Sequence, residues 1–310
     1  MPTRHVSATL LSACVLLAAP AASQQPRITN ARLTPQTVTT LSQTFRSLLA
    51  GQDGVAWIGY GVPVRDRDRV MCCWTNANGA TYISGSLSRG DDTCCGGCRL
   101  EPASEATGGD RQGSPAKTQA PVKLEGAERM VVLFRVVDRR VERIRAFSED
   151  CELDAGGRQV HWLGSVDGRE SVALLESIVA AEPERGPRVT HGALQAISMH
   201  AGPAAATAIE QLARSHKAAA VRGDALFWLA QMAGEKVAGT ITAAIENDPD
   251  TEVKRRAVFA LGQLPRSEGV PLLIDVARKN KNPAVRRQAI FWLGQSKDPR
   301  AIEFFAEILK

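Results

Sequence analysis

An apolar pattern that returns every 32 residues dominates the second half of this chain. The pattern is marked by a valine at four positions, Val189, Val221, Val253 and Val285. An alanine follows each valine at offset four, and a leucine or isoleucine follows at offset eight. Three columns that recur four times indicate a tandem array rather than a chance spacing. Arrays of this kind stack their repeats on one another and present extended binding surfaces.

Each repeat is predicted to contain two helices. The segments Val253–Gln263 and Val285–Gln295 have apolar residues at spacings of three and four, which is typical of a helix. A short linker with Pro follows each segment, and a second periodic stretch completes the unit. We therefore expect an all-α array over 161–310, with four repeats that begin at 189, 221, 253 and 285. A half-repeat should precede them, because Asp167 and Glu170 have the spacing of a helix-capping box.

The last repeat carries the pattern Val-Arg-x-x-Ala-x-x-x-Leu-Gly, which includes the segment Gln288–Gln295, Gln-Ala-Ile-Phe-Trp-Leu-Gly-Gln. This pattern, with its period near 32, resembles the HEAT-like repeats of the phycobilisome-lyase type. The resemblance implies a helical solenoid over about 161–310, and it implies no particular activity, because such repeats serve many partners. Some relatives act on bilin chromophores as lyases, but nothing in this sequence supports a bilin site.

The N-terminal residues predict export. A short basic region with Arg4 precedes an apolar run over 6–19 and small residues at 19–23, so residues 1–23 are expected to be a cleaved signal peptide. The run is too short to span a membrane, and we expect no membrane span elsewhere. Cys14 also fits a lipoprotein signal, but the apolar run continues past it, which favours simple cleavage. The mature protein should be periplasmic or extracellular.

Six cysteines remain after removal of Cys14, and all of them precede the repeats: Cys72, Cys73, Cys94, Cys95, Cys98 and Cys151. An even number in an exported chain indicates three structural disulfides, although the connectivity stays open. Two alternatives remain. Cys95-Gly-Gly-Cys98 has the spacing of a redox motif, and together with Cys72 and Cys73 it could supply four thiolates to zinc.

The region 24–160 is predicted to be a small, disulfide-rich, mostly-β domain, in which we recognise no family. Met130–Val137 and Val141–Phe147 should form a hairpin about Asp138–Arg140, and Val55–Tyr60 is rich in strand formers. A short helix is expected over 39–50.

Residues 101–120 are rich in Gly, Ser, Pro and Ala and have no apolar period, which predicts a mobile surface loop. The expected fold class is therefore a two-domain α+β protein, with the β domain followed by the helical array. Because the array has its own apolar pattern and no cysteine, we expect the segment from Asp167 to Lys310 to fold alone.

The first helix of each repeat has two distinct faces. Advancing about 100° per residue places the valine, alanine and leucine columns in one core arc, with Trp228 and Trp292 at its edge as packing residues. A column of phenylalanines lies outside this arc, beside arginine and glutamine. We predict that this stripe binds a partner, and the alternative is that each phenylalanine packs against the next repeat. The predicted contacts are Phe227, Arg255, Phe259, Gln263, Arg287, Phe291 and Gln295.

A second column is predicted to be structural. Arg222, Lys254 and Arg286 each follow the valine of their repeat and lie near the Asp-rich turns at Asp248 and Asp250. We expect these cations to join one repeat to the next by charge-assisted hydrogen bonds.

The sequence contains no phosphate-binding loop, no GxSxG elbow and no HExxH motif, and its five histidines have no metal-ligand spacing. The net charge of +5 is too small to require nucleic acid. We predict an exported, non-enzymatic interaction or scaffold protein without a cofactor, whose partner is a protein or peptide. The arginines of the stripe suit an acidic partner. The alternative is an enzyme, or its accessory subunit, with a thiol or metal site in the cysteine-rich domain. Apolar residues near Lys310 also allow self-association through the last repeat.

Overall fold

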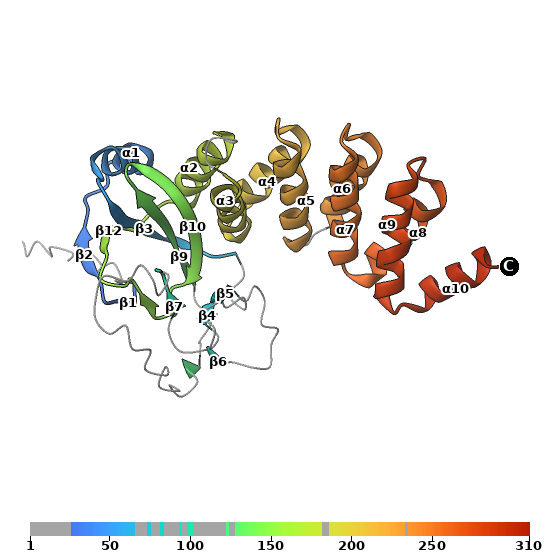
Figure 1. Ribbon diagram of the computed structural model, residues 1–310, viewed down its shortest axis with the longest axis horizontal. Helices are drawn as coiled ribbons and strands as arrows, with labels where there is room; N and C mark the ends of the chain where they lie inside the picture. The colour runs from blue at the N-terminus through green and yellow to red at the C-terminus, as the bar shows by residue number, and fades with distance from the viewer. Residues whose placement is uncertain are drawn as a thin grey trace, which may run out of the picture.

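A sheet lies at one end of the molecule, and a row of helices extends from it (Figure 1). The computed structural model describes the residues 26–65, 73–75, 81–83, 93–94, 98–101, 122–123, 128–181, 186–232 and 235–310. The expected signal peptide at 1–23 lies outside these residues, as do Cys72, Cys95 and the segment 102–120 of the expected loop.

The principal sheet has five strands: β2 (Arg32–Pro35), β3 (Val55–Pro63), β9 (Arg129–Val137), β10 (Arg140–Ser148) and β12 (Gln159–Ser165). Their order in the sheet is β10-β9-β3-β12-β2. β9 pairs antiparallel with β10 and β3, whereas β12 pairs parallel with β3 and β2. The predicted hairpin is confirmed, and its turn residues Asp138 and Arg139 both have positive φ angles. β12 also continues across the domain boundary expected at 160/161.

Short strands complete the N-terminal region. β1 (Ile28–Thr29), β7 (Cys98–Arg99) and β11 (Leu153–Asp154) form a parallel sheet in the order β1-β11-β7. Two further pairs are β4 (Cys73–Thr75) with β5 (Thr81–Ile83), and β6 (Thr93–Cys94) with β8 (Val122–Lys123). The predicted short helix is present as α1 (Leu41–Gly51), on the face of the principal sheet that meets the array.

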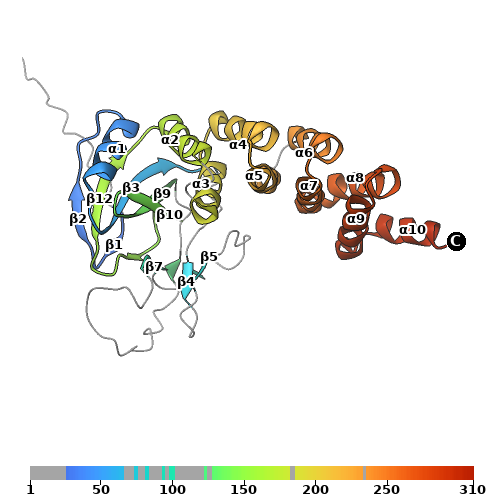
Figure 2. The same cartoon turned by 45° about the horizontal axis from the view of Figure 1, so that its top comes forward.

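The helical array begins with α2 (Gly168–Ala180). The first helices of the repeats are α3 (Pro187–Met199), α5 (Ala219–Gln231), α7 (Thr251–Gln263) and α9 (Pro283–Ser296). The second helices are α4 (Pro203–Ser215), α6 (Glu235–Asn247), α8 (Arg266–Lys279) and α10 (Pro299–Ile308). The first helices start 32 residues apart, as the sequence period requires. Figure 2 shows α4, α6 and α8 in one row and α3, α5, α7 and α9 in another.

The core columns of the first helices lie where the periodicity places them. The four valines of the repeat are at most 2% exposed, and the four alanines are fully buried. Ile290 is an exception, since it is 37% exposed although its equivalents Leu194, Leu226 and Val258 are fully buried.

The sheet and the array share one apolar core. Ile58, Tyr60 and Phe134 project from the sheet into a cluster that continues through α2 and α3 into the later repeats. Phe134 contacts Phe45 of α1, with ring centroids 4.7 Å apart. α2 and α3 therefore bury apolar faces against the sheet as well as against each other. That the array folds alone stays a prediction.

Close packing between α3 and β10 depends on a glycine. A Cβ added to Gly192 would lie 2.3 Å from the carbonyl oxygen of Ile144, far inside contact distance. Other repeats carry Asp224, Arg256 and Gln288 at the same position. Gly192 therefore adapts the first helix of the first repeat to a strand instead of to solvent.

The start of α2 confirms the predicted cap. The Asp167 carboxylate accepts hydrogen bonds from the backbone N–H groups of Arg169 and Glu170 at 2.8 and 3.2 Å. Glu170 in turn accepts from the backbone N–H of Leu41 at 3.4 Å. The first residues of α2 are thus bonded to the first residue of α1, which adds a polar link between the array and the sheet region.

The opposite face of the sheet has its own core, which includes Trp57, Leu133, Phe147 and Trp162. Cys151 is buried in this core and is disulfide-bonded, as predicted for that cysteine. The backbones of Cys73, Cys94 and Cys98 lie in β4, β6 and β7. Across the described part of the chain, no helix has the length and apolar character needed to cross a bilayer.

Glu101 corrects the prediction of a surface loop that starts at this residue. Its side chain is buried and accepts hydrogen bonds from Trp57 Nε1 at 2.8 Å and from Arg135 Nε at 3.0 Å. Arg135 also pairs with Glu142 at 2.5 Å. Burial raises the pKa of Glu101, but the bonds from Arg135 and Trp57 outweigh burial and lower it. The local composition gave no sign of this paired carboxylate, because its partners lie on distant strands.

Candidate partner-binding site

Aromatic rings on successive first helices form a continuous ladder. Phe227 of α5 stacks on Phe259 of α7 with ring centroids 5.6 Å apart and an interplanar angle of 1°. Phe259 then contacts Trp292 of α9 at 4.9 Å, and Trp292 contacts Phe291 at 5.1 Å. We define the aromatic ladder as Phe227, Trp228, Phe259, Phe291 and Trp292.

Exposure of the predicted phenylalanines changes along the ladder. Phe227 and Phe259 are half-buried between repeats, so for these two the packing alternative describes their position. Phe291 is 53% exposed, and among the described residues its ring contacts that of Trp292. Trp228 and Trp292 are half-buried packing residues, as predicted from the edge of the core arc. The exposed apolar group of the predicted stripe is therefore Phe291.

Exposed polar groups flank the ladder on α7 and α9. Arg255 pairs with Glu252 one turn earlier at 2.9 Å and approaches Gln288 of the next repeat at 3.5 Å. The Arg287 side chain is exposed and makes no ion pair with any described residue. Gln263 and Gln295 are also exposed. Arg287, Gln263 and Gln295 are thus accessible to a partner, whereas Arg255 already bonds Gln288 across α7 and α9.

Arg256 has a structural role that the sequence analysis did not identify. It crosses from α7 to α5 and pairs with Asp224. A Cβ on Gly223 would lie 2.4 Å from Arg256 Cδ, so Gly223 leaves the space that this arginine occupies. The sequence signal for this ion pair was Gly223 followed by Asp224, with an arginine 32 residues after the aspartate.

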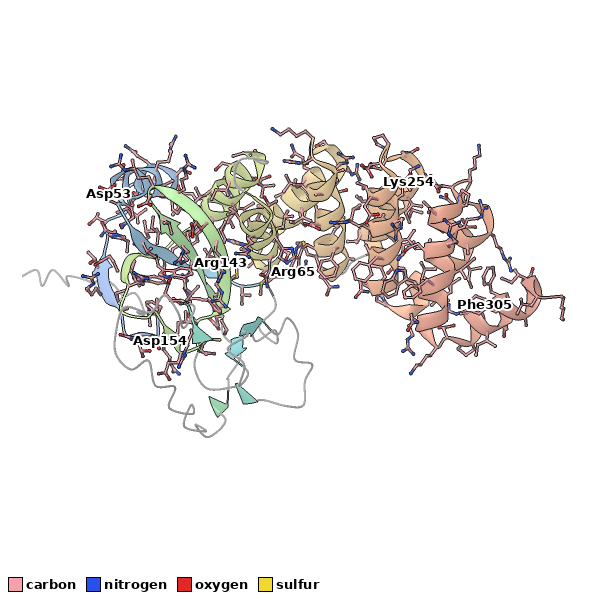
Figure 3. All side chains as sticks on the ribbon, viewed as in Figure 1. Asp53, Arg65, Arg143, Asp154, Lys254 and Phe305 are labelled. Carbon is pink, nitrogen blue, oxygen red and sulfur yellow. The ribbon has the colours of Figure 1, made fainter. Side chains whose placement is uncertain are left out.

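The predicted link between repeats is present at Arg222. This arginine donates to both carboxylate oxygens of Asp248, at 2.7 and 2.9 Å, and to the carbonyl of His216 at 2.8 Å. Burial raises the pKa of Asp248, but the bonds from Arg222 outweigh burial and lower it. Lys254, the equivalent cation one repeat later, donates to the Glu246 carbonyl at 2.8 Å and lies at the edge of the array (Figure 3).

Arg286, one repeat later, makes the same kind of bond to backbone carbonyls. It donates to the carbonyls of Asn280 and Lys281 at 2.8 and 3.1 Å. The turns between repeats also share one hydrogen bond, made by residues that lie 32 positions apart in the sequence. His216, Asp248 and Asn280 each accept a hydrogen bond from the backbone N–H two residues later. The turns are therefore held by the same bond with three different side chains.

A small pocket adjoins the ladder at the ends of α7 and α9. Its volume is about 200 Å³, and Trp292 forms part of its wall. Leu261, Leu264, Val270 and Leu273 also line it. Polar atoms are available at the lining residues Arg266, Gln295 and Ser296. We call this cavity the Trp292 pocket.

A second cavity of about 320 Å³ lies where the parallel strands β3 and β12 end. Its lining mixes charges of both signs, including Arg129 and Glu149, which are 3.9 Å apart. Burial raises the pKa of Glu149. Sequence reasoning did not identify this cavity, because its residues come from strands far apart in the chain.

A buried hydrogen-bonded chain connects the sheet to α2 and α3. His200 Nδ1 lies 2.7 Å from the Ala196 carbonyl and therefore carries the proton, while Nε2 lies 2.7 Å from Ser171 Oγ. Ser171 Oγ lies 2.8 Å from the Tyr60 hydroxyl. Burial lowers the pKa of His200 to about 4 and raises that of Tyr60. All three residues are buried, and this chain of hydrogen bonds links the sheet to α2 and α3.

No metal centre is indicated by the side chains that the structure describes, since no three His, Cys, Asp or Glu residues among them converge on one point.

The last helix leaves apolar groups accessible. Phe304 is buried and Phe305 is half-buried, but Ile302 and Ile308 of α10 and the C-cap residue Leu309 are exposed. Figure 3 shows Phe305 near the far end of the array. This surface is the one that the sequence associates with self-association.

Comparison with known proteins identifies the repeats. The HEAT-repeat family matches residues 239–310. No curated protein matches the chain. Human deoxyhypusine hydroxylase, solved in complex with glycerol, is 20% identical over 41% of this chain and 43% of its own, with a TM-score of 0.34. The chain thus spans less than half the length of that protein, and so low a TM-score supports no argument. The family match and the 32-residue helix period together show that the C-terminal part of this chain is an array of HEAT-like repeats.

Proposed function

We propose that this protein is exported and that its array binds a protein partner through the first helices, without catalysing a reaction. The observation that carries the proposal is the exposed C-terminal half of the predicted stripe. Phe291 offers an apolar surface, and Arg287 offers a charge that no described residue neutralises. Aromatic and arginine side chains dominate the binding energy of protein interfaces. Gln263, Gln295 and Arg255 add polar groups around them.

Co-purification from the exported fraction of the native cell tests this proposal. Wild-type protein should enrich a partner that the double variant Phe291→Ala, Arg287→Ala loses at least tenfold. Lys279→Ala, which removes an exposed cation on α8, is the matched control and should retain the partner. The absence of any partner that depends on Phe291 and Arg287 would overturn the proposal. Circular dichroism must show equal helix content in all three proteins.

Phe259 is excluded from the affinity test because it is part of the packing between repeats. Its truncation should lower the free energy of unfolding by about 2 kcal/mol, less than for a fully buried phenylalanine, because Phe259 is half-buried. Truncation of the exposed Phe291 should cost less than about 1 kcal/mol. A loss of affinity in Phe291→Ala can therefore be assigned to the surface rather than to unfolding.

The alternative function is an enzyme, or an accessory subunit, that uses thiols or a metal in the cysteine-rich region. The buried disulfide at Cys151 favours the structural use of these cysteines. Alkylation without reduction, followed by mass spectrometry and metal analysis of the mature protein, separates the two. Labelling at Cys95 and Cys98, or one bound zinc per chain, would support the alternative.

Self-association through α10 is a separate proposal about the same array. Exposed Ile302 and Leu309 provide an apolar surface of the kind that stacks on another helix. Sedimentation should show a concentration-dependent dimer that Leu309→Glu abolishes. A monomer at all concentrations would contradict it.

A further inference from the structure

The Trp292 pocket is continuous with the exposed half of the stripe. Trp292 forms part of its wall and also contacts Phe259 and Phe291 of the ladder. Gln295, which the sequence placed in the stripe, lines the same pocket. A chain that lies across Phe291 and Gln295 therefore passes the opening of the pocket.

The size and lining of the pocket define what can fill it. Pockets that hold a cofactor or a drug-sized ligand usually exceed about 300 Å³, so a pocket of about 200 Å³ is too small for either class. It is large enough for one apolar side chain. Leu264, Val270 and Leu273 offer a floor without charge, and an indole wall suits an aromatic or branched aliphatic group.

The positive charge beside the pocket favours a peptide in which acidic residues flank the side chain that enters the pocket. Arg266 lines the pocket, is exposed and makes no ion pair with a described residue. It lies near Asp298, whose pKa falls to about 2 mainly through its bond with Arg300, with Arg266 contributing. Arg287 on α9 is likewise unpaired among the described residues. An acidic peptide complements both arginines, whereas a basic one would meet like charge.

We propose that the Trp292 pocket receives one aromatic or aliphatic side chain of an acidic, extended peptide segment, which it anchors on the array. This inference rests on the proposed function and specifies the chemistry of the partner. The acidic flanks of the segment lie along Arg266 and Arg287, and the anchor enters between repeats three and four.

Gly262 allows the pocket to be closed without removing any side chain. It is exposed on α7 and lines the pocket, and an added Cβ would lie 3.5 Å from Trp292 Cδ2, an ordinary contact. Gly262→Ala therefore leaves the pocket open, while Gly262→Met fills it. Gly294 occupies the same column one repeat later, and its added Cβ would meet no atom within 4 Å. Gly294→Met is the matched control, since it adds the same side chain outside the pocket.

The test uses the full-length protein and labelled peptides of the form Gly-Asp-Glu-X-Asp-Glu-Gly, with X as Phe or Ala. Fluorescence polarisation should show that the Phe peptide binds roughly tenfold or more tightly than the Ala peptide. Gly262→Met should remove this preference, whereas Gly262→Ala and Gly294→Met should keep it. A Phe peptide with Asn and Gln in place of its acids should bind several-fold more weakly at low salt.

The remaining outcomes distinguish a failure of the pocket inference from a failure of the proposed function. Equal binding of the two acidic peptides, absence of binding, or a preference that survives Gly262→Met would overturn the pocket inference. The stripe is judged separately, by the loss of the native partner in the Phe291→Ala, Arg287→Ala variant. Should Gly262→Met fail to fold, 4-fluorophenylacetate serves as a competitor of the wild-type protein. It should displace the Phe peptide but not the Ala peptide, and failure to do so would also overturn the inference.

Discussion

At the residue scale, Arg222 and Lys254 hold equivalent positions but make different bonds. Arg222 bonds Asp248 with two hydrogen bonds and also holds a carbonyl of the preceding turn. Lys254 donates to one carbonyl. Both side chains of the Arg222–Asp248 pair are largely buried, so removal of the cation leaves a carboxylate with little access to water.

Arg222→Met should lower the free energy of unfolding by about 3 kcal/mol, because breaking a buried ion pair leaves one charge uncompensated. Lys254→Met should cost less than about 1 kcal/mol, since a lysine-to-carbonyl bond at the surface contributes little. Urea denaturation of both variants measures the difference. Equal losses would show that the Arg222–Asp248 pair contributes no more than the exposed lysine does. Asp248→Asn in the Arg222→Met background should recover part of the loss.

At this scale the sequence predicted the burial of whole repeat columns, but it did not predict differences in burial between members of one column. The valines, alanines and the Arg222 link were predictable, because their environment repeats with the period. Phe259 and Phe291 have nearly the same local sequence, yet one is half-buried and the other exposed. What distinguishes them is the presence of a following ring, Trp292 in the case of Phe259. Such a neighbour belongs to the assembled array and not to the local pattern.

At the element scale, the contact between α3 and β10 depends on Gly192. The Ile144 carbonyl occupies the space of any larger side chain. Gly192→Ala should therefore push the helix away from the strand and cost roughly 2 kcal/mol or more, the range of overpacked cores. Gly239→Ala on α6 is the control, because its added Cβ meets nothing within 4 Å. It should stabilise the protein by about 0.5–1 kcal/mol through helix propensity. Thermal melts that shift in the same direction for both would contradict this assignment.

A second prediction at the element scale concerns His200, which joins α3 to α2 and the sheet through Ser171. Its pKa is about 4 in the folded protein, below the ordinary value of 6.5, so the unfolded chain binds more protons between these values. The contribution of His200 to stability should be constant above pH 6.5 and fall by about 3 kcal/mol as the pH drops to 4. His200→Gln should flatten that part of the pH dependence, whatever its effect on stability at pH 7. Denaturant midpoints across pH 4–8 measure the difference, and parallel curves would rule out His200 as the titrating group.

The pairing of elements was less predictable than the elements themselves. The hairpin, α1 and the repeat helices follow from local patterns. The docking of α3 on β10 joins segments about 50 residues apart in sequence, and its signal was a single glycine where other repeats have polar side chains. Glu101 was similarly hidden, because a Gly- and Ser-rich neighbourhood indicates a loop and gives no information about Arg135 and Trp57 on distant strands.

At the scale of the whole molecule, the shared core makes the sheet the N-terminal cover of the array. Repeat arrays need their terminal apolar faces covered, and the sheet covers α2 and α3. A fragment that begins at Asp167 should therefore lose the packing that covers α2 and α3 as well as the sheet. We expect it to keep helix content in the later repeats but to expose the faces of α2 and α3, melt at lower temperature than the full chain and bind a hydrophobic dye. A fragment that melts at the same temperature as the full-length protein would instead support the two-domain prediction.

The same shared core determines how the binding surface is oriented. Two domains joined by a flexible linker can rotate independently, so the first would have no fixed direction relative to the second. Here β10 packs directly on α3, and Tyr60, Ser171 and His200 bond across the same junction. The stripe on α7 and α9 therefore keeps a constant direction with respect to the sheet. A load on a partner bound at the stripe would pass from α9 and α7 through α5 to α3, and from there to β10, so the sheet serves as the base of the array.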